Sequence, residues 1–192
     1  MQGISLIVGL GNPGPEYAET RHNAGFRFLD ALLSGSNTNL RRESRFTGDV
    51  ARYAIDGKEL WLLAPQTFMN KSGESVAKFA NYYKIPPAEI LVAYDEIDLP
   101  VGAVRFKVGG GTAGHNGLTD IVEKLGSPDC ARLRIGVGHP GSAPQVASYV
   151  LKRAPASEQK LIDDSIARSL GHLPDIVRGE FQKVMNALHA QN

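Results

Sequence analysis

The first thirty residues constrain the fold of this chain more than any other segment. An apolar run over residues 4–10 leads into a loop in which glycine and proline alternate, Gly-Asn-Pro-Gly-Pro over residues 11–15. A buried strand followed by a rigid loop is how α/β proteins place functional side chains at the carboxyl end of a sheet. Proline fixes its own φ and disfavours the α conformation in the preceding residue, so Pro13 and Pro15 keep the loop non-helical. The first helix is therefore predicted to begin near Asn23 and to cover residues 24–33, with His22 in the loop before it.

The same segment matches a dinucleotide-binding fingerprint. Residues 9–14 fit G-x-G-x-x-G, but that fingerprint requires its last glycine to lie at the start of a helix whose N-terminus holds the pyrophosphate. Pro13 and Pro15 flank Gly14, and no acidic residue ends a second strand about 20 residues further on. Nucleotide binding remains only a weak alternative.

Strand-like and helical patterns alternate along the whole chain. Strands are predicted over residues 4–10, 47–55, 58–64, 90–94, 104–108 and 132–137, and helices over 24–33, 72–83, 118–125, 157–170 and 173–188. This alternation predicts an α/β sandwich, a mixed twisted sheet flanked by helices. With 192 residues, 42% of them hydrophobic, the chain suits a single domain spanning 1–192. Residues 140–144 are predicted to form a surface loop that could serve as a lid.

Composition narrows the compartment and the partners. A lone cysteine, Cys130, forbids an internal disulfide and indicates a reducing compartment. There is no apolar run of roughly 18 to 20 residues and no signal-peptide pattern at the N-terminus, so we expect a cytoplasmic protein without membrane contact. The net charge is only +1, so a polyanionic partner would need a local basic patch. Candidates for such a patch are Arg105, Lys107, Lys124, Arg132 and Arg134.

Polar side chains follow several of the predicted strands. Asn12 follows the first strand, Asn70 follows residues 58–64, and Asp95 follows residues 90–94. His115 and Asn116 follow the glycine-rich loop after residues 104–108. If these strands are neighbours with their carboxyl ends together, all of these side chains and His22 open onto one crevice.

His22 is the natural general base of such a crevice. An imidazole that titrates near 6.5 can accept a proton at working pH, and a carboxylate on its other nitrogen, for which Asp95 is the candidate, fixes its tautomer. No serine or cysteine lies in a nucleophile motif, so water is the expected nucleophile. The five histidines show no H-x-x-x-H or H-E-x-x-H spacing, so neither a metal nor another cofactor is predicted.

Six motifs in one order resemble the signatures of bacterial-type peptidyl-tRNA hydrolase. They are Val-Gly-Leu-Gly-Asn-Pro-Gly at 8–14, Thr-Arg-His-Asn-Ala-Gly at 20–25, Thr-Phe-Met-Asn-Lys-Ser-Gly at 67–73, Asp-Glu-Ile-Asp-Leu-Pro at 95–100, Gly-His-Asn-Gly-Leu at 114–118 and Arg-Leu-Arg-Ile-Gly-Val-Gly-His-Pro-Gly at 132–141. One departure is visible: Thr112-Ala113 stands where many relatives carry His-Gly, which bears on the mobility of the glycine loop.

The resemblance implies a hydrolase that uses water activated by His22 to cleave the ester between a peptide and the 3′-terminal ribose of tRNA, without cofactor or metal. It assigns His22, Asp95 and Asn12 to catalysis, and Asn12 also to the distinction between peptidyl and free aminoacyl ends. The substrate-binding positions that it implies are Tyr17, Phe68, Met69, Asn70, His115 and Asn116. Lys107 and Arg134 match positions that contact tRNA phosphate. A monomer is implied, acting on dropped-off peptidyl-tRNA or on stalled large ribosomal subunits.

Two further functions stay open on the residues themselves. A water-dependent esterase or peptidase of another substrate class would use the same His22 and Asp95 but would not need the basic patch. An RNA-binding module without catalysis would need the basic patch but neither His22 nor Asp95.

Overall fold

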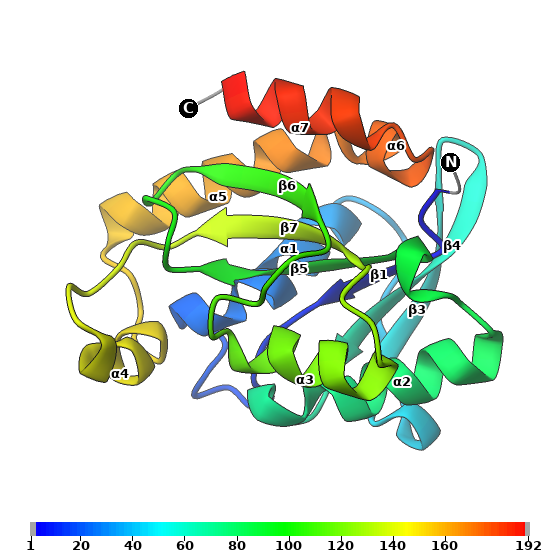
Figure 1. Cartoon of the computed structure of the whole chain (residues 1–192), viewed down its shortest axis with the longest axis horizontal. Coiled ribbons are helices and arrows are strands. Elements are labelled where there is room, and N and C mark those ends of the chain that lie inside the picture. The colour runs from blue at the N-terminus through cyan, green and yellow to red at the C-terminus, as the bar shows by residue number, and fades with distance from the viewer. Residues whose placement is uncertain (1–2, 191–192) are drawn as a thin grey trace.

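The protein is described here by a computed structural model that covers residues 3–190, and its strands form one mixed sheet (Figure 1). The strand order is β2-β3-β4-β1-β5-β7-β6. The strands are β1 (Leu6–Gly9), β2 (Arg41–Glu43), β3 (Gly48–Ile55), β4 (Lys58–Pro65), β5 (Ile90–Glu96), β6 (Val104–Val108) and β7 (Ala131–Gly136). β4, β1, β5 and β7 run parallel, whereas β3 and β6 run antiparallel to them. The predicted mixed sheet is confirmed, and the short edge strand β2 was not predicted.

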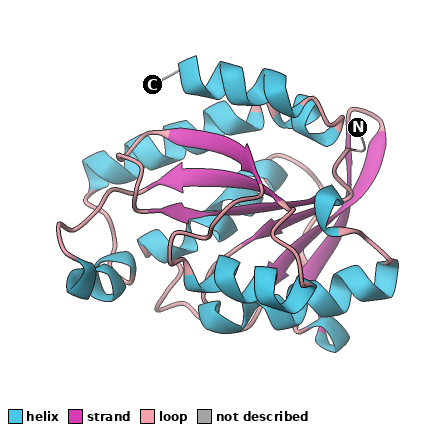
Figure 2. Ribbon diagram, viewed as in Figure 1, coloured by secondary structure: helices cyan, strands magenta, loops and turns pink. Residues whose placement is uncertain are grey.

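Helices cover both faces of this sheet, which confirms the predicted sandwich (Figure 2). They are α1 (Ala24–Leu33), α2 (Ser72–Tyr83), α3 (Asn116–Leu125), α4 (Val146–Val150), α5 (Ala156–Leu170), α6 (Leu173–Val177) and α7 (Phe181–Ala190). Side chains of α1, α5, α6 and α7 share one apolar core with the sheet, and those of α2 and α3 share the other. The short helix α4, absent from the prediction, lies beside these layers (Figure 1). Within residues 3–190, every helix is too short or too polar to cross a bilayer.

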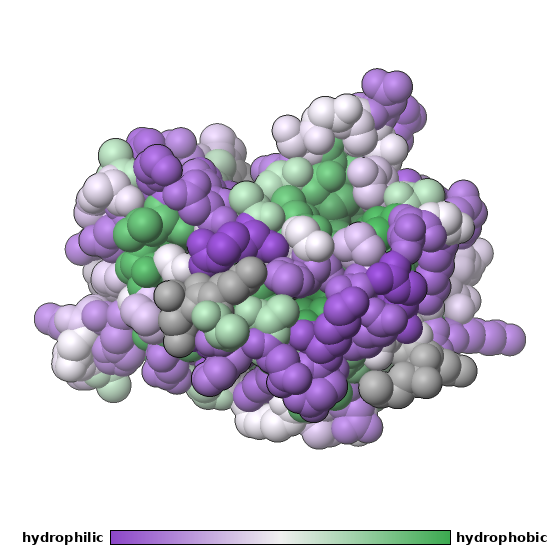
Figure 3. All heavy atoms as spheres, turned by 90° about the horizontal axis from the view of Figure 1, so that it is seen from above, coloured by the Kyte–Doolittle hydropathy of each residue, from purple (hydrophilic) through white to green (hydrophobic). Residues whose placement is uncertain are grey.

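The C-terminal segment differs from the single helix predicted over residues 173–188. The backbone of Gly179 has a φ of +86°, a left-handed conformation that an α-helix cannot continue through, and α6 and α7 are separated there. The change of direction lets α7 lay Phe181, Val184 and Leu188 on the sheet. On the face of the molecule that carries α6 and α7, polar residues cover most of the surface and apolar residues are visible between them (Figure 3).

The junction of β1 and α1 agrees with the prediction made from the prolines. α1 begins at Ala24, and its first turn packs against the end of β1 without side chains between: a Cβ on Gly9 would lie 2.3 Å from the Gly25 carbonyl oxygen. Gly14 has a φ of +106° and belongs to a turn, not to the start of a helix. The helix N-terminus that a dinucleotide site requires after the third glycine is therefore not there.

The direction of β6 corrects one step of the sequence argument. β6 is antiparallel to β7, and its last residue, Val108, pairs with Ala131 at the start of β7. β6 therefore ends at the amino-terminal ends of the parallel strands, far from the carboxyl ends of β1, β4 and β5. Residues 109–115 run back along the sheet to those carboxyl ends, where α3 begins (Figure 1). His115 and Asn116 therefore reach the predicted crevice by this returning loop and not by a strand end.

Candidate active site

A cavity of about 500 Å³ opens at the carboxyl ends of β1, β4 and β5. All nine side chains predicted to act in catalysis or in substrate binding line it: Asn12, Tyr17, His22, Phe68, Met69, Asn70, Asp95, His115 and Asn116. These residues come from four separate segments of the chain, 12–22, 68–70, 95 and 115–116, and the fold brings them together at the carboxyl ends of the strands, where the sequence argument had placed them. Lys107 and Arg134 do not line this cavity.

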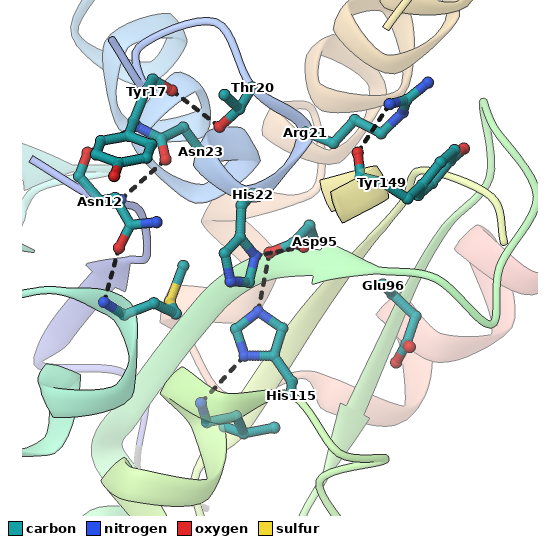
Figure 4. A network of polar contacts seen from close by, with 12 residues as sticks. Asn12, Tyr17, Thr20, Arg21, His22, Asn23, Asp95, Glu96, His115 and Tyr149 are labelled. Atoms are coloured by element: carbon teal, nitrogen blue, oxygen red, sulfur yellow. Dashed lines mark hydrogen bonds and ion pairs between the residues drawn. The ribbon is translucent and has the colours of Figure 1, made fainter. Parts of the chain in front are cut away.

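His22 and Asp95 are hydrogen-bonded to each other in the polar part of the cavity. His22 lies in the 3₁₀ turn η1 (Arg21–Asn23) between the proline-bounded loop and α1. Its Nδ1 lies 2.8 Å from Oδ2 of Asp95, which is 2% exposed near the end of β5 (Figure 4). The predicted pairing of the imidazole with this carboxylate is present.

His115 occupies the other oxygen of the same carboxylate. Its Nε2 lies 2.8 Å from Oδ1 of Asp95, and its Nδ1, at the N-cap of α3, accepts the backbone N–H of Leu118 at 3.2 Å (Figure 4). An Nδ1 that accepts a hydrogen bond puts the proton of the neutral ring on Nε2, so His115 donates to Asp95. Asp95 can accept from both rings, which leaves Nε2 of neutral His22 with a free lone pair.

The buried carboxylate sets the charge of this centre. Burial disfavours the imidazolium form of His22, but the Coulombic attraction and hydrogen bond of Asp95 outweigh it and raise the pKa of His22 above its ordinary value of 6.5. Burial alone would raise the pKa of Asp95, whereas the charges and hydrogen bonds of His22 and His115 lower it well below its ordinary value. Asp95 is therefore ionised at neutral pH, and His22 is a base strengthened by its partner.

Asn12 is held rigidly with its amide donor free for the cavity. Its backbone N–H donates to Oδ1 of Asn23 and its carbonyl accepts from Nδ2 of Asn23, each at 2.9 Å. Its own Oδ1 accepts the backbone N–H of Met69 at 2.7 Å. The Nδ2 group of Asn12 is thus left to donate to a bound group (Figure 4). The role of Asn23 in holding Asn12 was not predicted, although Asn23 lies in the motif at 20–25 and at the predicted start of the first helix.

The apolar lining of the cavity has a predicted part and an unpredicted part. The predicted residues Phe68 and Met69 both lie in the segment after β4, where Phe68 is 60% exposed and Met69 is buried. The part that the sequence argument did not identify comes from α4 and its flanks, which supply Ala143, Val146, Ala147, Val150 and Leu151. The spacing of Val146 and Val150, one helical turn apart after Pro144, was the available signal for this helix.

The two histidines and Asp95 also form a possible ligand set for a metal ion, which the spacing of histidines in the sequence did not reveal. Their ligand atoms lie within 4.8 Å of one another. Each N–O pair is at 2.8 Å, a hydrogen-bond distance, and the Leu118 N–H on His115 favours a proton on the nitrogen that faces Asp95. This pattern favours a hydrogen-bonded triad over a metal centre.

The five residues predicted as candidates for a basic patch differ in exposure and in their contacts. Arg132 is 0% exposed and donates to the carbonyls of Gly111 and Pro128, so its guanidinium is no part of a surface patch. Arg105 contacts the backbone of β6 and α7, and Lys124 pairs with Asp120 on α3. Lys107 and Arg134 remain partly exposed on β6 and β7.

Arg134 has a buried partner that was not predicted. Its Nε donates to Oε1 of Glu96 at 3.1 Å, and Glu96, next to Asp95 in β5, also lines the cavity. Partial burial and the charges of Arg134 and Arg132 lower the pKa of Lys107. Cations therefore crowd this part of the sheet with one buried carboxylate among them, which favours an anionic partner beside the cavity.

The departure from the usual glycine loop falls on a demanding backbone position. Ala113 has a φ of +50°, a left-handed conformation that glycine adopts without cost, and it lines the cavity beside Gly114. The hydroxyls of Thr112 and Thr119 lie 2.7 Å apart and join the loop to α3. Thr112 and Ala113 therefore restrict the loop that carries His115.

Comparisons with known proteins identify the family of the chain. The family model described as "Peptidyl-tRNA hydrolase" matches residues 6–192. The chain is 51% identical over 192 residues to the peptidyl-tRNA hydrolase of Pseudomonas putida, covering 100% of this chain and 99% of that one. It is 50% identical over 188 residues to that of Neisseria gonorrhoeae, covering 98% of each. The crystal structure of peptidyl-tRNA hydrolase from Acinetobacter baumannii superposes with a TM-score of 0.95 at 48% identity, covering 99% of this chain and 96% of that one. The chain belongs to the peptidyl-tRNA hydrolase family.

Proposed function

We propose that this protein hydrolyses the ester bond of peptidyl-tRNA and releases a peptide and a reusable tRNA. The observation that carries the proposal is the buried Asp95 carboxylate between two imidazoles in a cavity that also holds three asparagines. An RNA-binding module without catalysis has no need of a histidine whose pKa is raised by a buried carboxylate. The family of the chain supplies the substrate class, since its relatives are named for that activity.

The proposed step is attack of water on the ester carbonyl. Nε2 of His22 takes a proton from the water as its oxygen bonds to the acyl carbon, and the carbonyl oxygen becomes an oxyanion. Asp95 stabilises the imidazolium through Nδ1. Collapse of the tetrahedral intermediate breaks the bond to the ribose oxygen, which receives that proton from His22. No covalent enzyme intermediate and no metal is required.

The asparagines supply hydrogen bonds that suit a peptide ester. Nδ2 of Asn12 is directed at the cavity because Met69 and Asn23 hold the rest of the residue. It is the candidate for recognising the peptide end and stabilising the oxyanion. Asn70 and Asn116, both exposed at the cavity, would bind substrate and position the water. His115 acts through Asp95, and Tyr17, Phe68 and Met69 form apolar surface for the peptide and the terminal adenosine.

The tRNA body would lie over the partly exposed cations of β6 and β7. Lys107 and Arg134 are the proposed phosphate contacts, with Glu96 orienting the guanidinium of Arg134. We further propose that the protein acts as a monomer in the cytoplasm, on peptidyl-tRNA that is free or held on stalled large ribosomal subunits.

The experiment that tests this function compares N-acetyl-aminoacyl-tRNA with its unblocked counterpart. We expect rapid release of tRNA from the blocked substrate and slow release from the free aminoacyl-tRNA. Equal cleavage of both, together with cleavage of simple esters, would favour the general esterase. Tight tRNA binding without cleavage of either would favour the RNA-binding module.

A further inference from the structure

The apolar wall formed by α4 has an anchor beside the proposed general base. α4 has only five residues, Val146–Val150, and it lies outside the two helical layers (Figure 1). Nevertheless it contributes three side chains to the cavity, Val146, Ala147 and Val150. A helix this short has little stability of its own, so its place depends on tertiary contacts.

Arg21, the residue before His22, makes those contacts. Its guanidinium donates to the carbonyl of Tyr149 at 2.9 Å (Figure 4). It also lies within 3.5 Å of the carbonyl of Lys152. The guanidinium carbon lies 3.8 Å from the centroid of the Tyr149 ring, and the backbone N–H of Arg21 also donates to Lys152. The Tyr149 hydroxyl donates to the carbonyl of Val137 after β7 at 2.6 Å. Arg21 and Tyr149 thus join η1, α4 and the end of β7.

The chemistry of this junction is specific to arginine. Arg21 is 8% exposed, and among residues 3–190 no carboxylate pairs with it, so helix-end carbonyls and an aromatic face take the place of a counter-ion. Carbonyls at the end of α4 lack intrahelical donors, and a cation there also interacts favourably with the helix dipole. A flat guanidinium can stack on a ring while donating in its own plane, which an ammonium group cannot do.

We propose that Arg21 is a positioning residue that fixes the α4 wall at its distance from His22 and thereby sets how the cavity fits the peptide part of the substrate. The inference rests on the proposed function for its substrate. It adds a role for a side chain that lines neither the cavity nor the basic surface. The two neighbours Arg21 and His22 thus serve the wall and the base respectively, both from the turn η1.

A nearby ion pair provides a matched control. Arg153 and Glu19 connect the same two segments at 2.9 Å, but their side chains are 72% and 57% exposed. Such an exposed pair contributes little to stability. Arg153→Ala therefore removes a cation from the same junction without touching the buried anchor.

The kinetic test uses an adenosine ester of an N-acetylated tripeptide with apolar side chains, so that tRNA-body contacts do not contribute. For Arg21→Met we expect KM to rise about fivefold or more and kcat to fall less than about threefold, the pattern of lost binding with intact chemistry. The midpoint of the acid limb of kcat/KM should not move, because the contact between His22 and Asp95 is retained. Arg21→Lys and Tyr149→Phe should lie between Arg21→Met and the wild type, and Arg153→Ala should match the wild type.

Hydrogen exchange of the amides in residues 146–153 gives a readout that does not depend on activity. We expect faster exchange there in Arg21→Met and Arg21→Lys, with no change in β5. Unchanged KM and unchanged exchange in Arg21→Lys and Tyr149→Phe would overturn the proposal even if Arg21→Met failed to fold. A fall in kcat with a moved acid limb would overturn it as well, because Arg21 would then act on His22. A wild-type protein inactive on all peptidyl esters would refute the proposed function, and the exchange data would still decide whether Arg21 anchors α4.

Discussion

Replacing Asp95 by asparagine should disable His22 through its tautomer. Nδ1 of His115 accepts the Leu118 N–H, so its Nε2 must carry a proton and needs an acceptor. The single oxygen of an asparagine at position 95 would turn toward His115, and its NH₂ group would face Nδ1 of His22. His22 would then be protonated on Nε2, the nitrogen that has to accept the proton of the attacking water.

The size of the loss follows from two contributions. Losing the hydrogen bond to the charged carboxylate costs about 1.5–3 kcal/mol, and forcing His22 back into its active tautomer leaves N–H groups facing each other at about 1–3 kcal/mol. Because about 1.4 kcal/mol is tenfold in rate, kcat should fall by about 10²- to 10⁴-fold. The pKa of His22 is raised only by Asp95 and lowered by burial, so the acid limb of the remaining activity should move to lower pH.

The assay is single-turnover hydrolysis of an N-acetyl-aminoacyl adenosine ester across the pH range, with the wild type as reference. A second replacement tests whether His115 causes the change of tautomer. His115→Ala in the Asp95→Asn background frees the asparagine oxygen for His22, so the double variant should be no slower than Asp95→Asn alone. A loss of less than about tenfold in Asp95→Asn, or an acid limb that stays in place, would refute the role given to Asp95.

Three further predictions concern separate parts of the site. His22→Ala should lower kcat by about 10²- to 10⁴-fold with tRNA affinity retained, measured by filter binding beside the rate assay. EDTA should leave hydrolysis of the minimal ester unchanged; a loss restored by zinc would assign the cluster of His22, Asp95 and His115 to a metal. Lys107→Ala/Arg134→Ala should weaken tRNA binding and flatten its log–log salt dependence by roughly 0.7 to 0.9 per lost contact, with the minimal ester unaffected. Two exposed lysines, Lys160 on α5 and Lys183 on α7, provide a charge-matched control. Lys160→Ala/Lys183→Ala should bind tRNA like the wild type, and equal weakening by both pairs would count against a specific phosphate site.

Much of the fold was predictable because local signals and tertiary structure agree. Pro13 and Pro15 delay the first helix to Ala24, and apolar runs mark β4, β5 and β7 within one or two residues. The convergence of Asn12, Asn70 and Asp95 followed from the parallel arrangement of β1, β4 and β5. These features depend on backbone restrictions and burial, which a single sequence records.

The parts that were not predictable depend on contacts between distant segments. Strand direction is not encoded in an apolar run, so the antiparallel β6 and the returning loop that carries His115 could not be foreseen. Arginine is typically a surface residue, so the burial of Arg132 was not predicted. It is possible because the carbonyls of Gly111 and Pro128 accept hydrogen bonds from its guanidinium. The pairing of Asn23 with Asn12 likewise appears only when the two loops are brought together.

The most direct test of the account titrates His22 itself. Neutral His22, protonated on Nδ1 toward Asp95, is the proposed base for the attacking water. Nitrogen NMR of the labelled His22 ring should give a pKa above 6.5 and an Nδ1–H tautomer at higher pH, and the acid limb of kcat/KM should have the same midpoint. A rate that stays constant while His22 changes charge, or a neutral ring protonated on Nε2, would contradict the account.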